Sequence, residues 1–306
     1  MNKLYVFGHT KPDTDSIASA IVFAKLQKAL GIDAVAYKLG EVNKETKYAL
    51  KTFEVEEPQT LTSVDENCDV ALVDNNEFSQ SVSGIEKAHV KMVVDHHKIK
   101  LETVEPIYFI TEPLGCTCTI LYKLYKQNEV DIDSQTAGLM LSAIISDTLL
   151  FKSPTCTEQD KEIAKKLAKI PGVDIESYGK EMLKAGTDIS DFTPFQVINI
   201  DSKEFNDKNA KFEISQVNAV DLDSVFSRQS ELEDAINKEI KEKNLDFYMF
   251  AATDILNANS KIIAIGNKAD TVEKAFGVNL ENNTAMLNNV VSRKKQMLPN
   301  ILNNLN

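Results

Sequence analysis

Short apolar runs alternate with segments of helical spacing through the first half of the chain. The pattern predicts strands at residues 3–8, 33–40, 69–74 and 90–95, and helices at residues 15–30, 41–53, 134–151 and 157–170. Within these segments residues 70–73 and 92–94 are apolar without interruption, as expected of strands that are covered on both faces. This alternation predicts an α/β fold whose N-terminal part has a mainly parallel sheet flanked by helices.

The second half of the chain has a different pattern. Strands are predicted at residues 210–221, 246–256 and 260–266, together with a long amphipathic helix at residues 223–244. These elements indicate a smaller α/β domain with a mixed sheet. The Asn-rich end, residues 300–306, is predicted to be a frayed tail.

A polar stretch that contains Gly, Pro and Asp, residues 184–196, separates the two patterns. A chain of 306 residues is long enough for two domains that each have a core. We therefore expect a first domain at residues 1–186, a hinge linker at residues 187–196 and a second domain at residues 197–306.

The composition is that of an ordinary globular protein, with 43% apolar and 26% charged residues. The first residues lack a signal-peptide pattern, and no apolar run approaches the roughly 20 residues that span a bilayer, so a cytoplasmic location is expected. The net charge of −12 argues against broad binding to nucleic acid or to anionic membranes. Any anion site must then be a local cluster of basic residues.

The four cysteines, at positions 68, 116, 118 and 156, do not indicate a disulfide framework in a chain of this size. Cys116 and Cys118 could suggest zinc, but a second cysteine pair with ligand spacing is missing. Small buried thiols are the favoured interpretation.

Acidic and imidazole side chains follow the predicted strands. The runs end at His9, at Asp74 and at Asp95 with His96 and His97. Because the carboxyl ends of parallel strands line the same crevice, we expect these side chains to meet at one edge of the sheet. An ionisable residue within the apolar helix at 134–151, Asp147, adds a buried carboxylate that needs a partner or a cation.

The spacing His9-x3-Asp13-x-Asp15 forms a compact chelating loop. Carboxylates with imidazoles suit Mn²⁺, Fe²⁺, Co²⁺ or Zn²⁺ better than Ca²⁺. Five or six such ligands could hold two ions, an arrangement that clamps the attacking and leaving oxygens in phosphoryl transfer.

Each feature also has a simpler explanation. An Asp at a strand end can be a turn former, Asp15 can cap the helix that follows it, the two adjacent histidines can be a hydrogen-bonded pair, and Asp147 can pair with a lysine. These explanations must all hold together, whereas three of the four histidines fall in the short motifs. The fourth, His89, is expected at the surface.

Six segments of the sequence resemble the motifs of a known family. They are GHTKPDTDS, LVDNNE, VVDHHK, LGCTCTI, ISDTLLFKSPTCT and VSRKKQ. In this order they resemble the family II (manganese-dependent) inorganic pyrophosphatases of the DHH phosphoesterase superfamily, over essentially the whole chain. The DHH-type motifs alone indicate only the superfamily, and the C-terminal Ser-Arg-Lys-Lys-Gln indicates a pyrophosphatase.

The resemblance implies two Mn²⁺ ions, with Co²⁺ as a possible substitute and Mg²⁺ arriving with the substrate. The implied ligands are His9, Asp13, Asp15, Asp74, His96 and Asp147. The first two would bind one ion, Asp15 and His96 would bind the other, and Asp74 and Asp147 would bridge both. The implied catalytic residues are His97, which would protonate the leaving phosphate, and Asp95, which would orient a histidine.

The resemblance also assigns the substrate, pyrophosphate, to a basic cluster made of Lys203, Arg293 and Lys294. Metals and cluster would lie on different domains, so the C-terminal domain is expected to close over the substrate. A water that bridges the ions would become hydroxide and attack one phosphorus in line. A homodimer through the N-terminal domain is implied as well.

Two positions depart from the family pattern. Asn75 stands where the family usually has His, and Lys11 stands where Asn is commoner. An amide can donate or accept a hydrogen bond but takes no proton at neutral pH, so Asn75 is expected to alter metal affinity or rate rather than abolish activity.

Other members of the superfamily are the nearest alternative, such as an exopolyphosphatase or an oligonucleotide phosphodiesterase. The nuclease branch tends to carry a Gly-Gly-Gly-His-type motif, and this chain has no Gly-Gly pair in its second half. A non-catalytic metal or nucleotide sensor is expected to lose a bridging Asp or the basic cluster, and both are present. The sequence has no P-loop motif.

Overall fold

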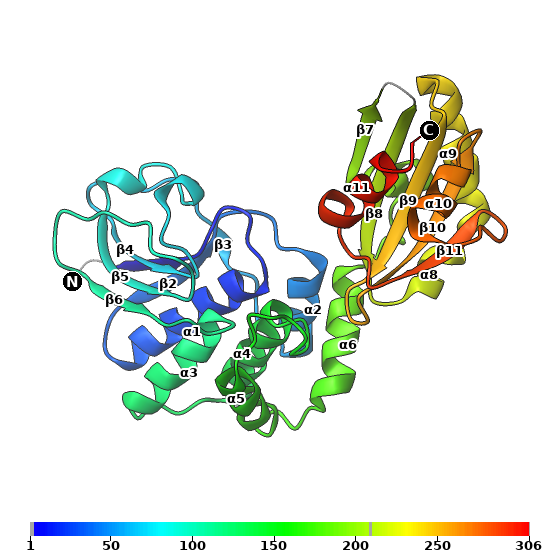
Figure 1. Cartoon of the computed structure of the whole chain (residues 1–306). Coiled ribbons are helices and arrows are strands. Elements are labelled where there is room, and N and C mark those ends of the chain that lie inside the picture. Colours follow the sequence, from blue (N-terminus) through cyan, green and yellow to red (C-terminus); the bar gives the residue numbers. More distant parts are fainter. Residues whose placement is uncertain (1–2, 208–209, 306) are drawn as a thin grey trace. The chain divides into compact units, whose positions relative to one another are not determined.

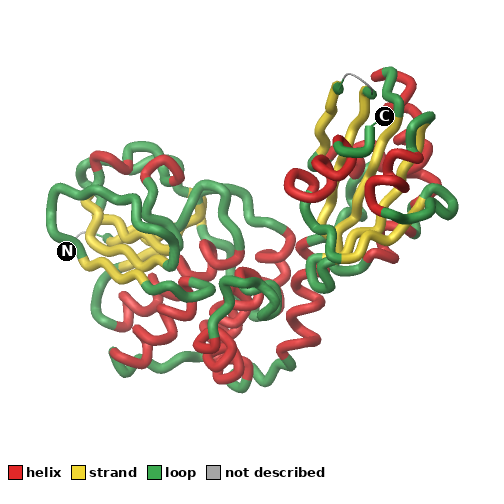
Figure 2. Tube along the Cα trace, in the orientation of Figure 1, coloured by secondary structure: helices red, strands yellow, loops and turns green. Residues whose placement is uncertain are grey.

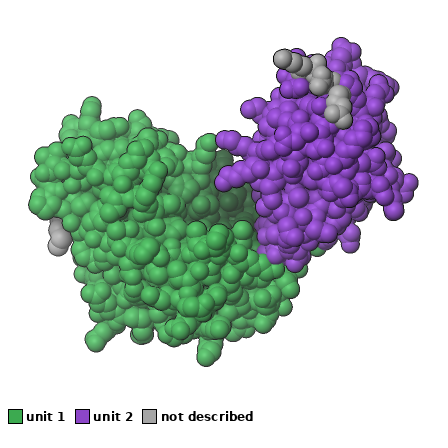
Figure 3. Space-filling view, in the orientation of Figure 1, with its two compact units in different colours: residues 1–186 green, residues 187–306 purple. Residues whose placement is uncertain are grey.

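The computed structural model describes residues 3–207 and 210–305. The chain divides into two compact units, residues 1–186 and residues 187–306 (Figure 3).

In the described part of the first unit, six strands form a sheet in the order β3-β2-β1-β4-β5-β6 (Figure 1). The strands are β1 (Leu4–Phe7), β2 (Ala34–Lys38), β3 (Gln59–Thr60), β4 (Asp69–Val73), β5 (His89–Asp95) and β6 (Tyr108–Thr111). Every neighbouring pair is parallel. The predicted parallel sheet is confirmed, whereas the short strands β3 and β6 were not predicted.

Helices and turns cover the two faces of this sheet differently. The helices are α1 (Thr14–Ala29), α2 (Lys44–Thr52), α3 (Thr117–Gln127), α4 (Ser134–Asp147), α5 (Glu158–Ala168) and α6 (Ile175–Gly186). One face packs against α1 and α3 (Figure 2). The other face is covered by the segment with two short 3₁₀ turns, Phe78–Gln80 and Ile85–Lys87, whose side chains pack on Leu72 and Val93.

The strand order reverses between β1 and β4, because β1 lies between β2 on one side and β4 on the other. Such a switch point opens a crevice at the carboxyl ends of the strands. Gly8 leaves β1 here, and a Cβ on it would lie 2.0 Å from Oγ of Ser16. Only glycine therefore allows the chain to deliver His9 this close to the start of α1.

Helix α4 ends earlier than predicted. It stops at Asp147, and Leu149, Leu150 and Phe151 then take left-handed φ angles of 47°, 53° and 68°. This conformation is costly for non-glycine residues. It is offset by the burial of Leu150 and by a 2.9 Å bond from its N–H to the carbonyl of Ile145. Asp147 thus lies at the C-terminal end of the helix and not in its interior.

In the described part of the second unit, five strands form a mixed sheet in the order β11-β10-β9-β8-β7. They are β7 (Ser202–Asn206), β8 (Lys211–Ala219), β9 (Phe247–Asp254), β10 (Asn259–Gly266) and β11 (Thr284–Asn288). β8 and β9 run parallel, and the other pairs are antiparallel. The predicted mixed sheet is confirmed.

Separate apolar clusters form on the two faces of this second sheet. The helical elements are α7 (Pro194–Asn199), α8 (Leu222–Phe226), α9 (Gln229–Lys243), α10 (Asp270–Phe276), the π-helical turn Arg293–Met297 and α11 (Leu298–Leu302). One cluster takes its side chains from α7, α8 and α9, and the other from α10, α11 and the π-helical turn. No helix in residues 3–207 and 210–305 has the length and apolar character that a membrane span requires.

Two predictions for the second unit are wrong. The single helix predicted at 223–244 is interrupted at Ser227 and Arg228, where the Arg228 guanidinium donates a 3.0 Å hydrogen bond to the carbonyl of Phe192. The predicted frayed tail contains most of α11, whose Ile301 is fully buried. Residue 306 lies outside the described residues.

Candidate metal centre and phosphate-binding cluster

His9 follows β1 and points to two carboxylates. Its Nε2 lies 3.5 Å from Oδ2 of Asp13 and 3.5 Å from Oδ2 of Asp74. The other oxygen of Asp13, Oδ1, caps α1 by accepting the N–H of Ser16 at 3.0 Å. Asp13 and not Asp15 is therefore the helix cap, so the capping explanation for Asp15 is wrong.

Asp15 is fully buried and held by the start of α3. Its oxygens accept the backbone N–H of Thr117 at 2.7 Å and of Cys118 at 3.2 Å, and the hydroxyl of Ser19 at 2.9 Å. The thiols of Cys116 and Cys118 are free and buried, as predicted. Both sulfur atoms lie within 4.8 Å of an Asp15 oxygen.

Asp74 is the residue that the other side chains surround. It follows β4 with a φ of 53°, a left-handed turn that aims its buried carboxylate into the crevice. Its Oδ1 lies 3.4 Å from Nε2 of His96, and its Oδ2 faces His9. Each oxygen of Asp74 therefore has an imidazole beside it.

A backbone hydrogen bond orients the His96 ring. Its Nδ1 lies 3.0 Å from the carbonyl of Leu114, so Nδ1 carries a proton and the neutral ring offers Nε2 as a ligand. That Nε2 lies 3.7 Å from Oδ2 of Asp147. The alternative that Asp147 pairs with a lysine has no support among the described residues.

Four groups of metal-ligating side chains lie close enough together in the described chain to hold a cation, and two of them combine carboxylates and imidazoles from the residues that the resemblance implies as ligands. The first is His9, Asp13 and Asp74, and the second is Asp15, Asp74, His96 and Asp147, with the ligand atoms of each group within 4.8 Å of one another. Asp74 belongs to both groups. Asp147 belongs only to the second, although the resemblance implied that it bridges. Carboxylates with imidazoles fit Mn²⁺ by their chemistry.

The carboxylates of the cluster stabilise positive charge on their neighbours, as the pKa values of His9 and His96 show. Burial lowers the pKa of His9, but hydrogen bonds to Asp13 and Asp74 outweigh it and raise the pKa to about 10. Burial likewise lowers the pKa of His96, and the hydrogen bond to Asp74 with the charge of Asp15 raises it to about 9. Without metal, protonated imidazoles thus supply the positive charge that the carboxylates require.

Two of the carboxylates are poorly compensated even so. Burial, with the charge of Asp74, raises the pKa of Asp15 to about 6. Burial, with the charges of Asp15 and Asp74, raises the pKa of Asp147 well above its usual range. Asp147 also ends a helix, where the helix dipole disfavours an anion. Bound cations would relieve both residues, so the donor set fits a metal centre.

His97 is held by the buried Asp95. Its Nδ1 lies 2.9 Å from Oδ1 of Asp95, and its backbone N–H donates to the same oxygen at 3.0 Å. The amide of Asn76 donates to the other oxygen of Asp95 at 2.6 Å. These bonds leave Nε2 of His97 available on a half-exposed side chain.

A cavity of about 130 Å³ lies beside this cluster. It is lined by His9, Asp74, Asn75, Asn76, Glu77, Gln80, Asp95, His97 and Lys98. Sequence reasoning assigned no role to Asn76, Gln80 or Lys98, although Asn76 and Lys98 lie within the quoted segments LVDNNE and VVDHHK. The Asn75 amide accepts the N–H of Glu77 at 2.9 Å, while its buried Nδ2 has no partner in the described chain.

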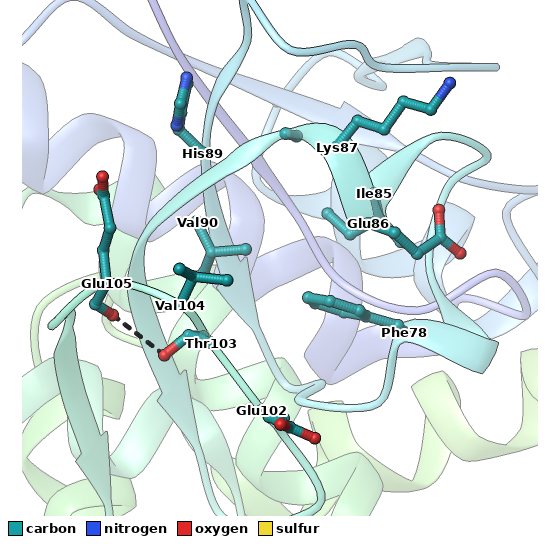
Figure 4. A pocket seen from close by; sticks show the side chains of 11 residues that line it. Phe78, Ile85, Glu86, Lys87, His89, Val90, Glu102, Thr103, Val104 and Glu105 are labelled. Carbon is teal, nitrogen blue, oxygen red and sulfur yellow. Dashed lines mark hydrogen bonds between the residues drawn. The ribbon is translucent and has the colours of Figure 1, made fainter.

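A larger cavity of about 290 Å³ on the first unit has a different character. Phe78, Ile85, Val90 and Val104 face one another in it, while the charged ends of the surrounding side chains point away (Figure 4). His89 lines it and is exposed, as predicted. No group of metal-ligating side chains found in the described chain includes these residues, whereas His9, Asp74 and His97 of such groups line the smaller cavity.

The basic residues that the sequence singled out lie on the second unit. Arg293 begins the π-helical turn, and its Nη2 donates to Oδ1 of Asp201 at 2.7 Å. Lys203 on β7 and Lys294 are exposed. Sequence reasoning missed Asp201, although it directly precedes β7, which carries Lys203.

Known proteins resemble both parts of the chain. Residues 3–144 match the N-terminal domain of the DHH family, and residues 180–304 match the DHHA2 domain. The manganese-dependent inorganic pyrophosphatase of Bacillus subtilis is 55% identical over 301 residues, which are 98% of this chain and 97% of that protein.

Solved structures give a consistent picture. A crystal structure from Methanococcus jannaschii, titled as a family II inorganic pyrophosphatase, is 40% identical, has a TM-score of 0.64 and covers 99% of both chains. An exopolyphosphatase-related protein from Bacteroides fragilis, with 13% identity and a TM-score of 0.50, covers 99% of this chain and 91% of its own and shows a shared fold alone. With its ordered motifs and a relative at 55% identity over nearly its full length, the chain belongs to the manganese-dependent inorganic pyrophosphatases of the DHH family.

Proposed function

We propose that the chain hydrolyses inorganic pyrophosphate to two phosphates at a binuclear Mn²⁺ centre on its first unit. The observation that carries the proposal is the position of Asp74, whose two carboxylate oxygens face His9 and His96 and which belongs to both groups of candidate ligands. One carboxylate shared by two ligand groups is what a pair of neighbouring ions requires.

Six residues would hold the ions, which are His9, Asp13, Asp15, Asp74, His96 and Asp147. When bound there, Mn²⁺ lowers the pKa of a coordinated water and neutralises charge on the phosphates. The N–H groups at the start of α3 keep Asp15 in place, and the carbonyl of Leu114 keeps Nε2 of His96 aimed at the centre. Co²⁺ is a possible substitute, and Mg²⁺ is proposed to arrive with pyrophosphate.

We assign the proton donor to His97. Its Nδ1 bond to Asp95 fixes the ring and favours the protonated form, which raises the pKa of His97. When water attacks one phosphorus, the bridging P–O bond breaks and the leaving phosphate takes a proton from Nε2 of His97. Asp95 acts through the imidazole that it orients.

The basic cluster on the second unit would hold the phosphates. Arg293 offers a planar fork that matches phosphate oxygens, and Lys203 and Lys294 offer exposed point charges. In a protein with a net charge of −12 such a local cluster is the feature that recruits an anion. Because one substrate must reach both the metal centre and the cluster, we propose that residues 197–306 close over residues 1–186 about the 187–196 segment.

Phosphate release with Mn²⁺ present tests the function. The substrates to compare are pyrophosphate, a long-chain polyphosphate and a short single-stranded oligonucleotide, at equal concentration. We expect rapid release from pyrophosphate and little from the other two. Preferred hydrolysis of the polyphosphate or the oligonucleotide would instead assign the chain to another activity of the DHH superfamily, and no turnover at all would support a sensor.

We also propose a homodimer through the first unit, in the cytoplasm. Strand β6 is an edge strand with a half-exposed Tyr108. Beside it lies a cavity of about 260 Å³, which is lined by apolar side chains such as Leu30 and Met92. An edge of this kind can pair with a second copy. Sedimentation analysis should give a dimer, and replacing Ile110 on β6 with Pro should give monomers.

A further inference from the structure

Asp201 holds the guanidinium of Arg293 from one side. Nη2 of Arg293 donates to Oδ1 of Asp201 at 2.7 Å, and Nε donates to Oδ2 at 3.4 Å. The Arg293 side chain is 17% exposed and that of Asp201 is 58% exposed. Both carboxylate oxygens thus contact the Nε–Nη2 edge of the fork. In the described chain no acceptor contacts Nη1.

Gln216 on β8 fixes the backbone under this ion pair. Its own N–H donates to the carbonyl of Asp201 at 3.0 Å, and its Oε1 accepts the N–H of Arg293 at 2.9 Å. Its Nε2 donates to the hydroxyl of Thr253 at 2.7 Å and to the carbonyl of Val291 at 2.8 Å. The segment before β7 and the segment before the π-helical turn are therefore tied to the same residue of the sheet.

Side chains also fix the loop that carries Arg293. The carbonyl of the Gln296 amide accepts the N–H groups of Val291 and Ser292, at 2.9 and 3.1 Å. The hydroxyl of Ser292 accepts the N–H of Lys295 at 3.2 Å. With its backbone held at both ends, Arg293 can move only through its side-chain torsions, and the bond to Asp201 restricts those.

On the basis of the proposed function, we propose that Asp201 is a positioning residue for pyrophosphate binding. Its carboxylate occupies the Nε–Nη2 edge of Arg293, so that the Nη1–Nη2 end of the guanidinium is left to face a phosphate. An arginine that is already ordered loses less side-chain entropy when it binds. Asp201 lies two residues from Lys203, so the same short segment sets the positions of two phosphate-binding charges.

Asp201 could instead weaken pyrophosphate binding, and the direction of the change in KM distinguishes the two roles. A carboxylate next to Arg293 can also compete with the substrate for the guanidinium, since both are anions. If Asp201 positions Arg293, removing the carboxylate raises KM for pyrophosphate. If Asp201 competes, removing it lowers KM. The side-on geometry favours positioning, because a free end of the fork remains for the phosphate.

The experiment compares D201A, D201N, R293A and the double variant D201A/R293A by steady-state hydrolysis of pyrophosphate with Mn²⁺. Loss of a charged hydrogen-bonded partner predicts a KM about five- to tenfold higher for D201A. D201N keeps one acceptor for Nη2 and should lie between the wild type and D201A. For both variants kcat should stay within about twofold and Mn²⁺ content should be unchanged, since Asp201 belongs to neither group of metal ligands.

The double variant separates positioning from a general loss of structure. Because Asp201 acts through Arg293, the KM of D201A/R293A should equal that of R293A alone. The control is E204Q, which removes the carboxylate charge of an exposed β7 residue that pairs with Lys211 at 3.3 Å and should leave KM unchanged. A lowered KM in D201A, an unchanged KM in D201A, or a further rise of KM in the double variant would each overturn the proposal.

Failure of the proposed function would look different. A wild-type protein that does not hydrolyse pyrophosphate, or an R293A variant with wild-type KM, would contradict the role of the basic cluster itself. A raised KM in R293A with no change in D201A would contradict only the role of Asp201. Melting temperatures of all variants, measured in parallel, identify any protein that has lost its fold.

Discussion

Nδ1 of His97 lies 2.9 Å from Oδ1 of Asp95, a carboxylate that is fully buried. A buried carboxylate beside an imidazole stabilises the protonated ring and decides which nitrogen faces the carboxylate. Nε2 of His97 is then the nitrogen that can transfer a proton. His96, the preceding residue, has its Nδ1 3.0 Å from a backbone carbonyl instead, so the two adjacent rings are oriented by different partners.

Replacing His97 with Gln should lower kcat while Mn²⁺ content stays nearly intact. A positioned general acid contributes about 10²- to 10⁴-fold, and glutamine cannot supply the proton. The measurement is kcat together with metal analysis of the same preparation. His97 also lies near Asp74 and His96. Loss of Mn²⁺ along with activity would mean that it is a ligand rather than an acid.

Replacing Lys294 with Ala should mainly weaken pyrophosphate binding. The side chain is exposed, so the fold should tolerate the change, and one lost point charge on a phosphate predicts a KM roughly tenfold higher. The neighbouring variant K295A is the matched control, since it removes the same charge one position along the turn. Unchanged kinetics in K294A, or an equal effect in both variants, would remove Lys294 from the binding cluster.

Metal removal should make stability depend on pH in a defined direction. In the metal-free protein the pKa values of His9 and His96 are about 10 and 9, above the value of 6.5 for free histidine. Because the folded values are raised, the protonated rings stabilise the fold fully below about pH 6.5. This contribution is lost as the pH rises through 9 to 10.

Added Mn²⁺ should reverse the loss. Metal binds the deprotonated imidazoles, so the increase in melting temperature on adding Mn²⁺ should be larger near pH 8.5 than near pH 6. Thermal unfolding of chelator-treated protein, with and without Mn²⁺ under anaerobic conditions, measures both effects. H96N should reduce the difference between the two pH values. A metal-free protein that becomes more stable from pH 6.5 to 9 would contradict the assigned pKa shifts.

Replacing Gly8 with Ala should destabilise the fold and disturb the metal centre together. The new Cβ would lie 2.0 Å from Oγ of Ser16 and 3.0 Å from its Cβ. Overpacking of this kind costs about 1–3 kcal/mol of folding free energy. The backbone shift that relieves it would also move the next residue, His9. Denaturant unfolding and Mn²⁺ affinity measure the two effects. G8A/S16G should recover part of both, and a G8A protein indistinguishable from wild type would contradict the close approach.

The strands and helices that the sequence predicts well are those with long, unambiguous patterns. The runs at 69–74 and 90–95 correspond to β4 and β5, because residues 70–73 and 92–94 at their centres are all apolar, as in strands covered on both faces. Strand β6 was missed although Tyr108, Phe109 and Ile110 form a short apolar run, because only four residues take part and none of them is fully buried. Strand β3, with two exposed residues, leaves no signal at all.

Tertiary contacts account for the helices that the pattern misplaced. Residues 223–244 have helical spacing throughout, yet the helix is interrupted where the Arg228 guanidinium donates a hydrogen bond to the carbonyl of Phe192, which is 36 residues away in the sequence. Residues 149–151 are as apolar as the helix before them, and only the burial of Leu150 shows why they turn left-handed. Local propensity cannot anticipate either event.

The grouping of the acidic and imidazole side chains could be inferred because parallel topology brings strand ends together. The parts of the site that could not be inferred act through contacts between distant segments. The bonds from Thr117 and Cys118 to Asp15 join residues about a hundred positions apart, and Asp201 meets Arg293 across 92 positions. Nothing in the spacing of these residues indicates that they touch.

In the proposed function, one centre with two divalent ions carries out the hydrolysis. The most direct test is metal analysis of protein purified without chelator, with pyrophosphate hydrolysis measured on the same sample and on D74N. We predict about two Mn²⁺ per chain in the active protein, and loss of both metal and activity in D74N. An active protein with one ion or none per chain, or D74N with full metal content and full activity, would contradict the account.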